Sequence, residues 1–403
     1  MKILIASLDD SKNINVGGKH IHQNLLKRAL EELGHSVHFV FPKRSIYYLL
    51  VRLGLKLLKY FNLITDPHIF KWTLAFMKKS LSSQIRDIDS VDCIFAQDPV
   101  SACATDIVKN NSSAPKVCMT LHGYLARESV NYGNYHKEDY DRILSTALEY
   151  ERDSLSYSDI IISVDTKIAD YLRGEFSATV PITILKNAID PDFFKEVSLK
   201  NVEGLKQKLE INNQDKVILV PRRLVRKNGV DIAIKALSNL NISSNLNYKL
   251  LIMGDGPELN KLKSLAKDLE IAKDIIFTGS IDHRSAAAYY KLADIVLIPS
   301  VIRDGVEEAT SLSMLEGMAA RKIVIVSNIG GMKEVITHNV NGFLFTQGDY
   351  IELSELLRSI ENLPSENAKR ICDDAFDFVV KNHHYKSHAI AYLESVSQVR
   401  NVN

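Results

Sequence analysis

The sequence predicts an α/β protein built from two doubly wound, Rossmann-like parallel sheets. Short apolar segments alternate with helical segments over about the first 195 residues, and a second alternation of the same kind follows. The chain has 403 residues, which is long for one hydrophobic core, so two domains of ordinary size fit better. We expect the boundary in a polar stretch from about 196 to 213, which includes a helical run at 203–209.

The first half begins as strand, loop, helix and strand. Residues 3–6 are apolar, 13–18 are polar, 21–33 carry apolar side chains on one side of a helix, and 37–41 form the next strand. The other strands expected in this half lie at 93–96, 117–121, 160–164 and 182–185, with helices most clearly at 141–158 and 165–173.

The second half repeats this alternation. Strands are expected at 217–220, 249–253, 275–278, 295–298, 323–326 and 343–345, and helices at 230–240, 257–270, 283–292, 311–320 and 350–362. A last helical stretch covers about 376–398. The domains are therefore expected at 1–195 and 196–375, followed by a C-terminal segment at 376–403.

The composition is typical of a soluble globular protein, with 46% apolar and 25% charged residues. A net charge of +1 argues against a nucleic-acid binder. Four cysteines without C-x-x-C spacing indicate neither a zinc site nor a disulfide framework, and they are expected to be reduced thiols in a cytoplasmic protein. Because Met1 leads directly into an apolar strand, we expect no leader peptide, and no uninterrupted apolar run reaches the ~18 residues of a membrane-spanning helix.

Residues 43–61, KRSIYYLLVRLGLKLLKYF, fit the sheet poorly. On a helical wheel one side gathers Ile46, Leu49, Leu50, Leu53 and Leu57, with Arg52, Lys56 and Lys59 along a flank, while other leucines lie on the remaining faces. Two interpretations stay open. One is a helix that contacts an anionic membrane surface at its periphery; the other is a helix packed on the N-terminal sheet with a solvated basic edge.

The most informative segment is 304–331, DGVEEATSLSMLEGMAARKIVIVSNIGG. It reads as a turn, a short helix, a strand and a glycine loop, with Glu308 before the helix and Glu316 within it. Thr310 and Ser311 offer N-cap hydroxyl groups at the helix start. Amide groups at a helix N-terminus suit a phosphate, so the segment outlines a ligand site.

This segment closely resembles the E-x7-E signature and glycine loop of family 4 glycosyltransferases, which have the two-domain GT-B fold. The resemblance implies that Glu308 contacts hydroxyl groups of the donor sugar and that Glu316 holds the nucleotide ribose. A carboxylate suits both tasks because it accepts two hydrogen bonds from a vicinal diol. Glu307 gives the wrong spacing and is expected to face solvent.

The chain departs from the family after the first glutamate. The usual Glu-Gly-Phe-Gly is replaced by Glu308-Ala309-Thr310-Ser311. The backbone amides of Thr310, Ser311 and Leu312 are therefore the expected donors to the pyrophosphate, with an altered fit.

Residues 221–229, PRRLVRKNG, follow an apolar strand and resemble the family's donor-phosphate site. Fixed cations are needed there because the leaving nucleotide diphosphate gains charge as the glycosidic bond breaks. Lys227 is the expected lysine. The spacing leaves the arginine open; Arg223 is preferred and Arg222 is kept.

Three glycine turns are weaker candidates. Gly254, in GDGP, and Gly279 with Ser280, in FTGS, follow strands, and the resemblance places them near the nucleotide base; strand-end turns without a ligand role are the alternative. Gly17 and Gly18 resemble the family's glycine loop near the donor phosphate, with an ordinary βα turn as the alternative.

His122 follows the strand at 117–121, at the sheet edge where doubly wound proteins bind ligands. The family often has a histidine at this place. The expected role of His122 is a hydrogen bond to the sugar or to the incoming hydroxyl group.

By resemblance, the chain is a retaining glycosyltransferase with two domains that face each other across a cleft. It would move a hexose or N-acetylhexosamine from a nucleotide-diphosphate sugar to a glycan or lipid-linked acceptor, in bacterial surface polysaccharide or lipopolysaccharide synthesis. No metal and no cofactor besides the donor are implied. The alternatives are a GT-B sugar-nucleotide epimerase and a non-catalytic GT-B binding subunit.

Overall fold

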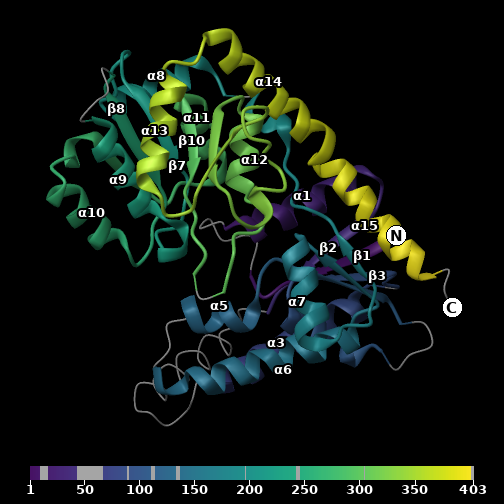
Figure 1. Cartoon of the computed structure of the whole chain (residues 1–403). Helices are drawn as coiled ribbons and strands as arrows, with labels where there is room; N and C mark the ends of the chain where they lie inside the picture. Colours follow the sequence, from purple (N-terminus) through teal and green to yellow (C-terminus); the bar gives the residue numbers. More distant parts are fainter. Residues whose placement is uncertain are drawn as a thin grey trace. The chain divides into compact units, whose positions relative to one another are not determined.

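The computed structural model describes residues 1–9, 17–42, 67–88, 90–109, 114–132, 137–195, 197–241, 246–303 and 305–400. These residues form two compact units, both drawn in Figure 1. The N-terminal unit holds 1–9, the described part of 19–186, and 385–400. The C-terminal unit holds the described part of 187–384, with Gly17 and Gly18.

The N-terminal unit contains a six-stranded sheet in the order β2-β1-β3-β4-β5-β6, in which all neighbouring strands are parallel. Mostly apolar segments form these strands, as the sequence pattern predicts, and β1, β3, β4 and β5 are largely buried. The strands are β1 (Lys2–Ala6), β2 (Ser36–Val40), β3 (Cys93–Ala96), β4 (Lys116–Leu121), β5 (Ile160–Ser163) and β6 (Ile182–Ile184).

Both faces of this sheet are covered. Ile3 and Ile5 pack with Leu26 of α1 (Gly18–Glu32) and Tyr392 of α15 (Tyr385–Arg400), whereas Leu4 packs with helix α3 (Pro67–Asp87). Successive strand residues thus face opposite layers, which makes the sheet doubly wound. The other helices of this unit are α4 (Pro99–Cys103), η1 (Ala104–Ile107), α5 (Leu125–Tyr132), η2 (Lys137–Asp139), α6 (Tyr140–Tyr157) and α7 (Thr166–Phe176).

The C-terminal unit contains a second parallel sheet of six strands, in the order β12-β11-β10-β7-β8-β9. Its strands are β7 (Lys216–Val220), β8 (Tyr248–Met253), β9 (Ile275–Gly279), β10 (Ile295–Ile298), β11 (Ile323–Ser327) and β12 (Phe343–Phe345). The helices are η3 (Pro191–Phe194), α8 (Leu199–Lys208), η4 (Arg226–Asn228), α9 (Val230–Asn241), α10 (Leu259–Asp268), η5 (Ala272–Asp274), α11 (His283–Leu292), α12 (Leu312–Ala319), η6 (Gly330–Met332), α13 (Tyr350–Glu361) and α14 (Ser365–Asn382).

Helices again cover both faces. On one face Ile218 and Leu250 pack with Leu237 of α9 and Leu353 of α13. On the other, α12 approaches β10 and β11 so closely that a Cβ on Gly317 would lie 3.0 Å from side-chain atoms of both strands. Gly317 therefore allows a close approach of the sheet to the helix that carries the predicted ligand site.

The structure differs from the sequence prediction at the C-terminus. The helix expected over 376–398 is two helices, α14 and α15, which are separated at His383 and His384. The structure divides at Lys186/Asn187 and His384/Tyr385, whereas the sequence places the boundaries at 195/196 and 375/376. The predicted helix over 43–61 lies outside the described residues. No helix in the described part is long and apolar enough to cross a bilayer.

The strand order fixes where ligands are expected. In the first sheet the order reverses between β1 and β3, and in the second it reverses between β7 and β10. Loops leave such a switch point toward opposite sides of the sheet, which opens a crevice at the carboxyl ends of the strands. In each unit, ligand-binding side chains are therefore expected at the carboxyl ends of the strands beside the switch point.

Candidate functional site

An ion pair lies at the switch point of the C-terminal sheet. Arg222, two residues beyond β7, places Nη2 at 2.7 Å from Oε2 of Glu308. The same Nη2 donates to Oγ of Ser300, two residues beyond β10, at 2.9 Å. Because β7 and β10 are the strands on either side of the switch point, one guanidinium group ties both strand ends to the predicted ligand loop.

Arg222 has two further partners and one orphan atom. Nη2 donates to Oδ1 of Asn228 at 2.6 Å, and Nη1 donates to Oγ of Ser311 at 3.4 Å. Nε is buried without a hydrogen-bond partner among the described residues. Arg223, which the sequence analysis preferred, is exposed. The structure therefore brings Arg222, and not Arg223, to Glu308, because the chain turns directly after the strand.

Glu308 is an ionised carboxylate whose side chain is 15% exposed. Burial alone would raise its pKa, but the charge of Arg222, the hydrogen bond from Arg222 and the charge of Lys227 together hold the pKa below its ordinary value. The predicted residues Arg222, Lys227 and Glu308 thus lie within electrostatic reach of one another. Their net charge is positive, which suits an anionic group.

Two glycines hold the loop around Glu308. A Cβ on Gly330 would lie 1.9 Å from the Glu308 carbonyl oxygen, and one on Gly331 would lie 2.6 Å from the Thr310 nitrogen. Gly330 N also donates to Oε2 of Glu307 at 3.0 Å. The expectation that Glu307 faces solvent is therefore wrong: it is half-buried and binds the glycine loop after β11.

The residues after Glu308 form the start of α12. Ser311 is the N-cap, and its Oγ accepts from Met314 N at 3.4 Å. Thr310 is buried, and its carbonyl oxygen accepts from Nδ2 of Asn187 at 2.8 Å. Leu312, the first residue of α12, is also buried. The sequence pattern thus located this helix start within one residue.

Glu316 is buried and held by two side chains that the sequence analysis missed. Nε2 of His283 lies 3.0 Å from its Oε1, and the hydroxyl group of Tyr290 donates to its Oε2 at 2.6 Å. The ring of His283 stacks on Phe193 at a centroid distance of 4.3 Å. His283 and Tyr290 stand at positions i and i+7 of α11, so their shared face was visible in the sequence, but their partner was not.

The remaining predicted glycines have different surroundings. Gly254 has φ = +153°, and a Cβ there would lie 2.1 Å from the Arg222 carbonyl oxygen. Gly254 therefore lets two loops meet beneath Arg222, which is a structural role. Gly279 has φ = +72° with open space around it, and Ser280 is exposed. Gly17 and Gly18 are exposed, and Gly18 begins α1.

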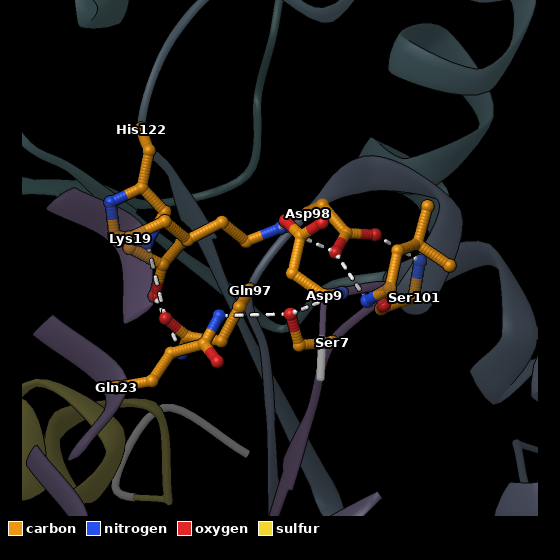
Figure 2. Close-up of polar contacts among 10 residues, drawn as sticks. Ser7, Asp9, Lys19, Gln23, Gln97, Asp98, Ser101 and His122 are labelled. Atoms are coloured by element: carbon orange, nitrogen blue, oxygen red, sulfur yellow. Dashed lines mark hydrogen bonds and ion pairs between the residues drawn. The ribbon is translucent and has the colours of Figure 1, made fainter. Parts of the chain in front are cut away.

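A second polar cluster lies at the switch point of the N-terminal sheet, and Figure 2 shows it. Nζ of Lys19, in the first turn of α1, lies 2.9 Å from Oδ2 of Asp98 and 3.0 Å from Oδ2 of Asp9. Asp98 also accepts from Leu8 N at 3.0 Å and from Ser101 N at 2.8 Å. Burial favours a raised pKa for Asp98, but these partners outweigh it and hold the pKa below its ordinary value.

His122 belongs to the same cluster. Its Nε2 lies 3.1 Å from Oε1 of Gln97, the residue that follows β3. Burial, the positive charge of Lys19 and His388 lower the His122 pKa to about 3. His122 is therefore a neutral imidazole at ordinary pH. The sequence found His122, but it missed Lys19, Gln97 and Asp98.

Two family models match the chain: "Glycosyltransferase Family 4" over residues 16–193 and "Glycosyl transferases group 1" over 201–375. An uncharacterized glycosyltransferase of Methanocaldococcus jannaschii is 27% identical over 356 residues, covering 85% of this chain and 84% of the relative. The alpha-monoglucosyldiacylglycerol synthase of Streptococcus pneumoniae is 25% identical over 233 residues, covering 57% of this chain and 51% of that enzyme.

The fold has close counterparts among solved structures. The Anabaena protein HepE, crystallised in complex with UDP-glucose, has a TM-score of 0.73 at 17% sequence identity, covering 99% of this chain and 100% of that one. The similarity in sequence and in structure thus extends over both units.

Proposed function

Because the chain belongs to family 4 of the glycosyltransferases and has the GT-B fold, we propose that it moves a hexose or N-acetylhexosamine from a nucleotide-diphosphate sugar to a glycan or lipid-linked acceptor, with retention of anomeric configuration. The C-terminal unit would bind the donor and the N-terminal unit the acceptor. No cofactor besides the donor enters this proposal.

The observation that carries the proposal is the charged group at the switch point of the C-terminal sheet. Arg222 and Lys227 supply two positive charges beside Glu308, at the N-terminus of α12. Breaking the bond between the anomeric carbon and the phosphate oxygen transfers negative charge to the leaving diphosphate. Fixed cations stabilise that charge more in the transition state than in the ground state, so they lower the barrier.

The orphan Nε of Arg222 fits this role. A buried guanidinium N–H without a protein partner is costly unless a ligand satisfies it, and a phosphate oxygen is a strong acceptor. The ion pair with Arg222 holds the Glu308 carboxylate in a position where it would accept hydrogen bonds from hydroxyl groups of the sugar. Glu316, held by His283 and Tyr290, would accept from the ribose hydroxyl groups.

In the proposed mechanism the leaving diphosphate takes the acceptor proton. The anomeric carbon–oxygen bond to phosphate breaks, the acceptor oxygen bonds to the anomeric carbon on the same face, and the hydroxyl proton moves to the departing phosphate oxygen. This chain then has to position two substrates and stabilise one anion, and it needs no nucleophilic side chain.

For the donor we propose a UDP-sugar as the first to test, since the Anabaena neighbour was crystallised with UDP-glucose. For the acceptor, the Streptococcus relative is named as a synthase of a glucosylated diacylglycerol, which favours a lipid-linked acceptor at a membrane face. Contact of residues 43–61 with that membrane is part of this proposal.

A thermal-shift panel of UDP-, GDP- and ADP-sugars, followed by a transfer assay with the stabilising donor, tests the proposal. A bound donor should raise the Tm by mass action, and Arg222→Met should abolish the shift. If no nucleotide sugar raises the Tm, the donor assignment fails. NMR of the donor with enzyme alone separates the alternatives: epimerised sugar supports the epimerase, and binding without turnover supports the binding subunit.

A further inference from the structure

A relay of hydrogen bonds leads away from His122 into the core of the N-terminal unit. Oε1 of Gln97 lies 3.1 Å from Nε2 of His122, and Nε2 of Gln97 donates to Oγ1 of Thr120 at 3.4 Å. The Thr120 hydroxyl group lies 3.0 Å from the Tyr392 hydroxyl group, which lies 3.1 Å from Nε2 of His22. Strand β4, helices α1 and α15 and the residue after β3 each contribute a member.

Every member of this relay except His122 is almost fully buried. Gln97 has 1% of its surface exposed, Thr120 and Tyr392 have 0%, and His22 has 2%. In such a place each group has to match the donors and acceptors of its neighbours, because bulk water is not there to compensate. A single donor-to-acceptor direction along the relay would satisfy each of these contacts.

The Gln97 amide sets that direction. Its Nε2 donates to Thr120, and the relay runs in one direction when the Thr120 hydroxyl group donates to Tyr392 and Tyr392 donates to Nε2 of His22. At the other end, the Gln97 oxygen can only accept, so Nε2 of His122 carries the ring proton. Burial keeps both rings neutral, because it lowers the pKa of His22 well below its ordinary value and that of His122 to about 3.

The consequence concerns the second nitrogen of His122. In a neutral ring with a proton on Nε2, Nδ1 carries a lone pair and can only accept. Among the described residues no hydrogen bond to Nδ1 of His122 is found, and the ring is only half-buried. The nearby Lys19 contacts Asp9 and Asp98, as Figure 2 shows, and no hydrogen bond joins it to His122 among the described residues.

We propose that Gln97 is a positioning residue that holds His122 as the Nε2–H tautomer, so that Nδ1 accepts a hydrogen bond from a carbohydrate hydroxyl group. The inference rests on the proposed function, because it assumes a sugar at this edge of the sheet. The hydroxyl group belongs either to the donor sugar or to the acceptor, and both present the same chemistry. The relay predicts the opposite tautomer, Nδ1–H, for His22.

The tautomers can be measured without any activity. In long-range ¹H–¹⁵N correlation NMR of the full chain labelled with ¹⁵N-histidine, the two ring nitrogens of a neutral histidine separate into a protonated and a lone-pair type. We expect Nε2–H for His122 and Nδ1–H for His22. The reverse pair would mean that the Gln97 amide is turned around, and it would overturn the proposal. Single His→Gln variants assign the signals.

Gln97→Met tests the positioning role. Methionine keeps the length of the side chain and removes the acceptor, so His122 should lose its single tautomer. Gln23→Met is the matched control: Gln23 is equally buried and donates to Oγ of Ser7 at 2.8 Å, but among the described residues it has no hydrogen bond to His122. The control should keep the His122 tautomer of the wild type.

Kinetics then locate the hydroxyl group. Loss of one hydrogen bond corresponds to a rise in KM of roughly 3- to 10-fold for one substrate, with little change in kcat. A rise for the donor alone assigns the donor sugar, and a rise for the acceptor alone assigns the acceptor. An unchanged tautomer and unchanged KM in Gln97→Met would refute the role. Absent transferase activity would refute the proposed function alone, because the NMR result does not depend on turnover.

Discussion

Replacing Arg222 with methionine is the sharpest test of the charged group in the C-terminal unit. The change removes the partner of Glu308 and leaves a carboxylate whose side chain is only 15% exposed. It also removes hydrogen bonds to Asn228, Ser300 and Ser311. Removing one partner of a buried ion pair typically costs 3–5 kcal/mol, so we expect the free energy of unfolding to fall by about 3 kcal/mol or more.

In Arg222→Met, the contribution of Glu308 to the pH dependence of the free energy of unfolding should have the opposite sign to that in the wild type. In the wild type the Glu308 pKa lies below its ordinary value of 4.5, so the ionised group adds stability that is lost as pH falls through the folded-state pKa. Without Arg222, burial should dominate and raise the pKa above 4.5. The folded variant then binds more protons than the unfolded chain, and it should gain stability as pH falls from 7 toward 5.

Arg223→Met is the matched control, since it removes the same charge from the exposed neighbour. It should change the free energy of unfolding by no more than about 0.5 kcal/mol. The double variant Arg222→Met with Glu308→Gln removes both charges, and it should recover about 1–3 kcal/mol of the loss.

Two probes separate the units in denaturant unfolding. Trp72, the only tryptophan of the chain, lies in α3 of the N-terminal unit, so its fluorescence follows that unit, whereas circular dichroism follows both. The Arg222→Met effect should move the dichroism transition and leave the fluorescence transition in place. Equal effects of Arg222→Met and Arg223→Met would refute the assignment of Arg222 as the buried partner.

Other outcomes follow from single sites. Gly229 has φ = +61°, and a Cβ there would lie 1.8 Å from the Pro299 carbonyl oxygen, so Gly229→Ala should cost about 2 kcal/mol or more of stability. Helical Gly204 has open space, and Gly204→Ala should instead stabilise by about 0.5–1 kcal/mol in the same denaturant titration. Glu316→Gln should weaken donor binding roughly tenfold by calorimetry, and an unchanged Kd would remove its ribose role. Because the His122 pKa is lowered to about 3 from 6.5, the folded protein binds fewer protons in that window; stability should fall as pH decreases from 6.5 toward 3, and less steeply in His122→Gln.

The sheets were predictable because their strands are short and mostly apolar, and the central ones are buried on both faces. All twelve strands described here lie within two residues of the expected ranges. An apolar, β-branched run such as 323–327 is typical of a strand that is covered on both faces of a parallel sheet. The chain crossings were not predictable in the same way. The positions at which the chain passes from one unit to the other depend on contacts between residues far apart in sequence, such as the hydrogen bond between His383 Nδ1 and the Asn187 carbonyl oxygen.

For the candidate site, the sequence likewise predicted the loops but not which of their residues face inward. A parallel sheet places the carboxyl ends of all its strands at one edge. The sequence could therefore point to the loops after β4, β7 and β10 without any knowledge of their shape. Which residue of a loop turns inward is decided by its packing. Arg222 is buried and Arg223 is exposed because the loop is fixed by neighbours that the local sequence does not reveal, such as Gly254 against the Arg222 carbonyl oxygen.

Partners of the functional side chains follow from that packing. His283 and Tyr290 share a face of α11, and the sequence pattern shows as much, yet their common function appears only when Glu316 of α12 is placed against them. Gln97 is an ordinary residue at the end of a strand until its amide meets His122. Sequence patterns therefore identify groups that can contact a substrate, whereas the side chains that orient those groups require the tertiary structure, because orientation is a property of pairs from different elements.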